Sequence, residues 1–192
     1  MTRRSVFTLA GRLAMESVTT FWRRAGTLCR LLTGALILAC TLCATSFAQT
    51  AQHLPEPVDL RASATDATAR GRVLLVLFSE SGCQWCERLR REYLLPMQRN
   101  AEAQKKLAFF QVDVHADTAL RDFAGQPTTQ AGLARRYGIR VMPTVLLLGP
   151  AGEKLAEPLV GFTSGDFYGA YLDERISSAA ASLAGQKGSK AN

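Results

Sequence analysis

The sequence predicts an α/β protein in which helices cover both faces of a central mixed β-sheet. Three apolar runs of strand length, at 73–78, 107–114 and 145–148, indicate strands that are buried on both faces. Helical patterns separate these runs, and the order strand, helix, strand, helix, strand, strand, helix implies a mixed sheet. A length of 192 residues, 47% of them hydrophobic and 20% charged, fits one globular domain and excludes a disordered chain.

The first half of the domain begins with a lead-in segment at 49–71, which contains a short predicted helix near 62–70. After the first strand, apolar and charged side chains alternate with helical spacing from Cys86 to Leu95. Pro96 is expected to break or kink this helix, and a second helical piece then runs to about 106.

Beyond the second strand, the polar segment 115–127 is predicted to be a loop. Thr128 or Thr129 is placed to cap the next helix, and Gly138 is placed to end it in a left-handed conformation.

The third strand is followed by a turn at 149–152 and by a predicted pairing strand at 153–160. Asp166 is a candidate cap for a last helix that ends near Leu183, and residues 184–192 are expected to form a flexible tail.

Residues 1–48 have the pattern of a secretory signal peptide. An uncharged apolar run from Leu31 to Ala48 follows an arginine-containing segment, and Ser46 and Ala48 are small residues placed for cleavage before Gln49. We therefore expect export to the periplasm by the general secretory route. Two alternatives stay open: the run of about 18 residues is near the minimum for an uncleaved inner-membrane anchor, and translation from Met15 would give a leader of ordinary length.

The net charge of +7 is concentrated in this leader. Of the 23 Lys and Arg and 16 Asp and Glu residues, six Arg and one Glu lie in residues 1–48, so the rest of the chain carries only +2. Such a small charge does not favour a nucleic-acid-binding protein.

The leader also contains three of the five cysteines, Cys29, Cys40 and Cys43, which leaves Cys83 and Cys86 in the exported chain. This pair lies between a buried strand and the start of a helix, where free backbone N–H groups and the helix dipole stabilise a thiolate. Cysteines of C-x-x-C motifs have pKa values of about 3.5 to 7, against about 8.5 for a free thiol. The pattern predicts a redox-active dithiol, with Cys83 as the nucleophile and Cys86 as the resolving cysteine.

Two other interpretations of the pair are weaker. A zinc site needs two more ligands, and the only imidazoles, His53 and His115, are not at metal-ligand spacing, so we expect no metal and no further cofactor. A purely structural disulfide is also possible, although a loop this short restrains the unfolded chain very little.

A second motif, Tyr-Gly-Ile-Arg-Val-Met-Pro-Thr at 137–144, lies about 57 residues after the C-x-x-C motif. The strand, the C-x-x-C helix and this segment together resemble the thioredoxin superfamily over roughly 72–178, and are similar to periplasmic members of the SoxW-like group and to DsbC catalytic domains. The resemblance implies a thioredoxin-like fold for 72–183 and thiol–disulfide oxidoreductase activity. It also implies that Pro143 is cis beside the disulfide and that the backbone of Met142 binds substrate; the alternative is that Pro143 merely begins a strand.

The sequence departs from ordinary thioredoxin near the dithiol. Gly82 precedes Cys83 where thioredoxin has a Trp, and Leu77 stands where that family has a buried Asp. Glu80 is a candidate to take over proton transfer, although a solvated loop carboxylate is the simpler interpretation.

Neighbouring side chains have weaker functional signals. Trp85 could offer a flat apolar contact to a partner or pack on the domain itself. Arg88, Arg90 and Arg91 are expected to form a solvated face. Asp113 is expected to cap the loop that follows it.

The resemblance does not set the direction of electron flow, which depends on the reduction potential. The residues Gln84-Trp85 match neither the Pro-His pair of the oxidant DsbA nor the Gly-Pro pair of thioredoxin, and 49–71 is too short for the dimerisation domain of a DsbC-type isomerase. We therefore expect a monomeric reductase of protein disulfides that a membrane thiol transporter of the DsbD type re-reduces. A disulfide oxidase or isomerase, or a non-catalytic binding module, is the alternative.

Overall fold

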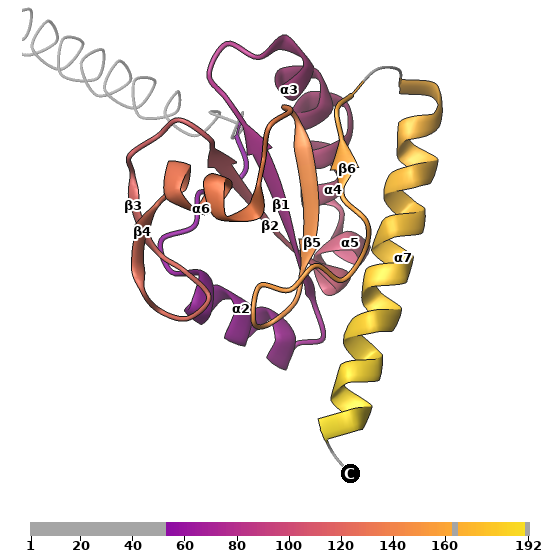
Figure 1. Cartoon of the computed structure of the whole chain (residues 1–192). Helices are drawn as coiled ribbons and strands as arrows, with labels where there is room; N and C mark the ends of the chain where they lie inside the picture. Colours follow the sequence, from indigo (N-terminus) through magenta and orange to yellow (C-terminus); the bar gives the residue numbers. More distant parts are fainter. Residues whose placement is uncertain (1–52, 163–164, 191–192) are drawn as a thin grey trace, which may run out of the picture. The chain divides into compact units, whose positions relative to one another are not determined.

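Figure 1 shows a computed structural model of the chain, in which residues 53–162 and 165–190 are described. The predicted signal peptide with its cleavage site, and the alternative start at Met15, lie outside these residues. None of the described helices combines the length and the hydrophobicity that crossing a membrane requires.

A four-stranded mixed sheet forms the centre of the described domain. Its strands, in spatial order, are β2 (Leu107–Asp113), β1 (Val73–Ser79), β5 (Thr144–Leu148) and β6 (Leu159–Val160). β1 and β2 are parallel, β5 is antiparallel to β1, and β6 is antiparallel to β5. Every residue of β1 is buried because this strand lies inside the sheet with helices on both faces. The predicted α/β class and mixed sheet are confirmed.

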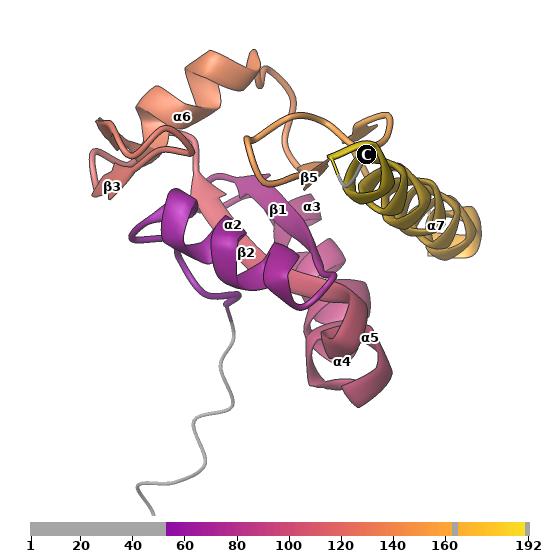
Figure 2. The ribbon, with the colours of Figure 1, turned by 90° about the horizontal axis from the view of Figure 1, so that it is seen from below.

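The helices lie in two layers, one on each face of the sheet (Figures 1 and 2). One layer holds α2 (Leu60–Ala69) and α6 (Gln130–Tyr137); the other holds α3 (Gln84–Leu89), α4 (Leu95–Arg99), α5 (Ala101–Lys106) and α7 (Gly165–Lys190). Successive residues of β1 point to opposite faces, so Leu74 and Val76 pack against the first layer, and Leu75 and Leu77 pack against the second.

The helical region after the C-x-x-C motif is divided differently from the prediction. A π-helical turn, η2 (Arg90–Leu94), joins α3 to α4, so that Pro96 lies in the first turn of α4, where its missing N–H group needs no partner. The chain breaks instead at Asn100, whose extended backbone ends α4 and whose side chain accepts the N–H groups of the first turn of α5.

Two other boundaries also differ. The predicted loop at 115–127 contains β3 (Ala119–Arg121) and leads into β4 (Pro127–Thr129), which form a small two-stranded sheet. Three-residue strands are too short to show an alternating pattern in the sequence. The predicted strand 153–160 is reduced to β6 and one bridge from Lys154 to Leu148, since Pro158 has no N–H group to donate to a neighbouring strand.

The remaining helix boundaries agree more closely with the sequence. Thr129 caps α6 by accepting the N–H of Gly132, and Gly138 ends that helix with φ of 69°. α7 runs to Lys190, beyond the predicted end near Leu183, because Leu183 is itself buried against the core and the following turns stay helical. The side chain of Asp166, the predicted cap of α7, lies outside the described residues.

Candidate active site

The two cysteines lie where β1 ends and α3 begins. Gly82 has φ of 77°, a left-handed conformation that favours glycine, and it turns the chain into the helix. Cys83 is the N-cap of α3, and its Sγ accepts the backbone N–H of Cys86 at 3.1 Å. The two side chains form a disulfide with a Cα–Cα distance of 5.3 Å. Cys83 is half-buried and Cys86 fully buried, so a partner can reach Cys83 more readily.

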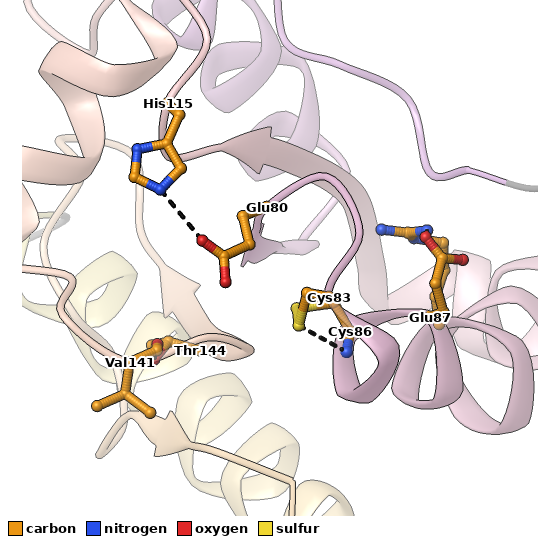
Figure 3. The surroundings of a disulfide bond; sticks show 8 residues. Glu80, Cys83, Cys86, Glu87, His115, Val141 and Thr144 are labelled. Carbon is orange, nitrogen blue, oxygen red and sulfur yellow. Dashed lines mark hydrogen bonds and ion pairs between the residues drawn. A yellow bond between two sulfur atoms is a disulfide. The ribbon is translucent and has the colours of Figure 1, made fainter.

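The segment around Pro143 lies at the same end of the sheet. Thr144, the first residue of β5, pairs with Phe78 near the end of β1, and Figure 3 shows Val141 and Thr144 in the surroundings of the disulfide. The Met142–Pro143 peptide bond is cis, the geometry that the resemblance implies. Pro143 is buried and Met142 half-buried, and the hydroxyl of Thr144 donates to the carbonyl oxygen of Val141 at 2.7 Å.

Glu80 does not extend freely into solvent. Its Oε2 lies 3.1 Å from Nε2 of His115 (Figure 3), and only 34% of its side chain is exposed. The backbone N–H of His115 in turn donates to Asp113 Oδ1 at 2.9 Å, which confirms that Asp113 caps this loop. The pair thus connects the active-site loop to the end of β2. Sequence inspection missed it, because the partners are 35 positions apart.

Apolar side chains contribute both to the surface around the dithiol and to the strand beneath it. Trp85 is 41% exposed and Val141 49% exposed, so apolar side chains from the C-x-x-C motif and from the Pro143 loop both face solvent. On β1, Leu77 is fully buried within an apolar cluster. That strand therefore supplies a hydrocarbon side chain at the position where ordinary thioredoxin has a carboxylate.

Arg90 corrects an expectation from the sequence. Arg91 is solvated, with 74% of its side chain exposed, and Arg88 is 43% exposed, but only 3% of the Arg90 side chain is exposed. Arg90 follows Cys86 by four residues, so the two side chains lie on the same, buried side of the helix. Its Nη1 donates to Glu87 Oε1 at 2.7 Å. The charge alone suggested a solvated residue, and helical spacing from Cys86 was the signal that could have corrected this.

This arrangement indicates thiol–disulfide redox chemistry. The site has an accessible sulfur, a buried second sulfur within bonding distance, and a helix N-terminus that favours the thiolate. Within residues 53–162 and 165–190, no group of three or more His, Cys, Asp and Glu side chains could hold a metal ion.

Comparisons with known proteins identify a family for most of the described domain. A family model described as a thioredoxin-like domain matches residues 60–176. Similar solved structures include a thioredoxin-fold protein from Helicobacter pylori (17% identity, 62% of this chain and 86% of that chain, TM-score 0.41). The periplasmic thioredoxin SoxS from Paracoccus pantotrophus is 18% identical over 56% of this chain and 99% of its own, with a TM-score of 0.41. A mutant thioredoxin from Halobacterium salinarum is 27% identical over 66% of this chain and 91% of its own, also with a TM-score of 0.41. No curated protein matches the sequence.

Proposed function

The chain belongs to the thioredoxin-like domain family, and on this premise we propose that it is an exported thiol:disulfide oxidoreductase that reduces protein disulfides. The observation that carries the proposal is the Cys83–Cys86 disulfide at the start of α3, with one sulfur accessible and the other buried. A stabilising disulfide would not need this asymmetry, nor would it gain much from so short a loop.

In the proposed reaction, the thiolate of Cys83 attacks one sulfur of a partner disulfide. The partner's S–S bond breaks, its other sulfur leaves as a thiolate that takes up a proton, and a mixed disulfide remains. The thiolate of Cys86 then attacks Cys83 Sγ and releases the partner's second sulfur, which is also protonated. The partner gains two electrons and two protons, and the Cys83–Cys86 bond forms. The N–H group that Cys86 directs at Cys83 Sγ would stabilise the attacking thiolate.

The surrounding residues receive supporting roles in this proposal. Glu80 would accept the proton that leaves Cys86, in place of the carboxylate that β1 lacks, and His115 would hold Glu80 in position. The exposed ring of Trp85 and the backbone of Met142 would bind the partner chain on either side of Cys83, next to cis Pro143.

Recycling requires a second thiol donor, because each turnover leaves the enzyme oxidised. In an oxidising periplasm, this donor would be a membrane thiol transporter of the DsbD type. The enzyme would act as a monomer without any cofactor other than its own dithiol.

The reduction potential tests the direction. Purified protein is equilibrated with glutathione buffers, and Cys86→Ser is mixed with an oxidised protein partner to trap the mixed disulfide, with Cys83→Ser as the control that cannot form it. A potential near that of thioredoxin, about −270 mV, supports a reductase, while one near −120 mV makes the protein an oxidant. A wild-type protein that does not exchange would overturn the enzyme proposal and leave a binding module.

Export is tested separately by fractionation. We expect the mature protein in the periplasm with Gln49 at its N-terminus. Recovery of the intact chain in the inner membrane would show that the leader is an anchor.

A further inference from the structure

Two charged residues are buried in the described part of the chain, Arg90 and Asp122. Asp122 lies in the turn between β3 and β4, away from the dithiol loop in the sequence. Arg90 directly follows α3, and its backbone N–H donates to the carbonyl oxygen of Cys86. The only buried positive charge among these residues is therefore one helical turn from the resolving cysteine.

The guanidinium of Arg90 is incompletely paired. Its Nη1 donates to Glu87, whose side chain is 50% exposed, while its Nε is buried and has no hydrogen-bond partner. Solvent weakens the field of an exposed carboxylate more than that of a buried cation. The positive charge of Arg90 is therefore only partly neutralised: the half-exposed Glu87 pairs with Nη1, while the buried Nε has no partner.

Arg90 also borders the segment that leads into Cys83. A pocket of about 220 Å³ is bounded by the 79–82 loop on one side and by Arg90 and Glu87 on another. The other titratable groups that line it are His53, Glu56, Glu80 and Asp113.

The other carboxylates of the pocket have partners of their own. Glu56 accepts a hydrogen bond from Gln130 at 2.8 Å, and Glu80 and Asp113 are both bonded to His115. Glu87 is therefore the carboxylate that balances Arg90.

We propose that Arg90 and Glu87 set the redox balance of the dithiol: the buried guanidinium stabilises the thiolate of the reduced pair, and Glu87 limits this effect. The inference rests on the proposed oxidoreductase function and adds a tuning device to it. Arg90 acts on the cysteines only through its electric field and takes no part in bond making or breaking, so it is not a catalytic residue. Because a thiolate exists only in the reduced protein, stabilising it favours the dithiol over the disulfide.

The test compares four variants of the full protein by their glutathione equilibrium and by titration of thiolate ultraviolet absorbance. Arg90→Met should shift the equilibrium constant between dithiol and disulfide about tenfold toward the disulfide, which corresponds to about 30 mV in reduction potential. A tenfold change is at the low end of the effect that one nearby charge has on the ionisation of a neighbouring group. Glu87→Gln should shift it toward the dithiol. Arg90→Lys should stay near wild type because it keeps the charge, and Arg91→Met removes an exposed charge from the same turn and should have little effect.

The opposite signs separate tuning from a packing role. Structural damage would move Arg90→Met and Glu87→Gln in the same direction, and that result overturns the inference, as would an Arg90→Met shift no larger than that of Arg91→Met. If Arg90→Met does not fold, Glu87→Gln decides alone, since an unchanged equilibrium in that variant contradicts the proposal. A wild-type protein that fails to exchange with glutathione defeats the proposed function itself, which is a different outcome.

Discussion

Asp122 and Arg90, the two charged residues buried in the part of the domain that the structure describes, differ in how well they are paired. Each is almost fully buried, and each is ion-paired to a residue at least half exposed, Arg136 and Glu87 respectively. Asp122 also accepts the backbone N–H groups of Ala124 and Gln126, so its carboxylate is well satisfied, whereas Arg90 keeps a buried Nε without a partner. Equal burial therefore conceals different roles: Asp122 organises a turn, and Arg90 leaves a residual field beside a reactive pair.

The largest effect should come from Asp122→Ala. This change leaves two backbone N–H groups and Arg136 without an acceptor, and we expect it to lower the free energy of unfolding by about 3 kcal/mol. Urea denaturation measures this loss, and Arg136→Met is the comparison, which should cost about 2 kcal/mol because the buried Asp122 carboxylate loses its ion-pair partner but keeps its two backbone N–H donors. The reduction potential should stay unchanged. A changed reduction potential in Asp122→Ala would contradict the proposal that Asp122 only stabilises the fold while Arg90 affects the dithiol.

The stabilisation from Asp122 should depend on pH. The hydrogen bond from Arg136 lowers the pKa of Asp122 below its ordinary 3.8, against the opposing effect of burial. A group with a lowered folded-state pKa stabilises the fold fully above its unfolded-state pKa and loses this contribution as the pH falls through the folded-state pKa. The difference in unfolding free energy between wild type and Asp122→Ala should therefore be constant near neutrality and shrink below about pH 4. A difference that persists unchanged in acid would contradict this account.

Tyr137, the last residue of α6, makes a partly buried hydrogen bond in which neither group is charged. Its hydroxyl donates to the carbonyl oxygen of Gly152 at 2.7 Å, and burial raises the pKa of Tyr137 to about 12. We expect Tyr137→Phe to cost about 1 kcal/mol, less than loss of the Asp122 carboxylate, since a neutral hydrogen bond has a smaller net value. Thermal unfolding at pH 7 checks this value, and a loss as large as that of Asp122→Ala would remove the distinction between charged and neutral groups.

The smallest effect on stability should be that of Arg90→Met. A methionine fills much of the same space, and the half-exposed Glu87 can be solvated after its partner is removed, so the unfolding free energy should change by no more than about 1 kcal/mol. The same variant should change the redox equilibrium, in contrast to Asp122→Ala. Severe destabilisation, measured by urea denaturation, would show instead that Arg90 is a structural residue.

The sequence predicted those features that rest on strong local patterns. The buried strands around β1, the cap at Thr129 and the end of α6 at Gly138 each follow from short-range chemistry that a single sequence displays. The π-helical turn at η2 and the small β3–β4 sheet were missed, because they depend on tertiary packing and on strands of only three residues.

In the candidate site, too, the sequence predicted the features that depend on local patterns and not those that depend on distant segments. The positions of Cys83 and Cys86 were readable from one motif beside one strand, whereas the Glu80–His115 pair joins distant segments, and no local signal marks it. Arg90 was assigned to solvent because charged side chains usually are exposed, and its place on the Cys86 side of the helix overrides that tendency.

The sulfur of Cys83 both caps α3 and belongs to the exchanging pair. A thiolate accepts a hydrogen bond more strongly than a sulfur in a disulfide, so reduction tightens the first helical turn and oxidation loosens it. The backbone amide of Cys86 should accordingly exchange its hydrogen with deuterated solvent more slowly in the dithiol form. A partner that takes Cys83 into a mixed disulfide weakens the cap in the same way, so the first turn of the helix is less firmly held at the stage when the resolving thiol has to move toward its target.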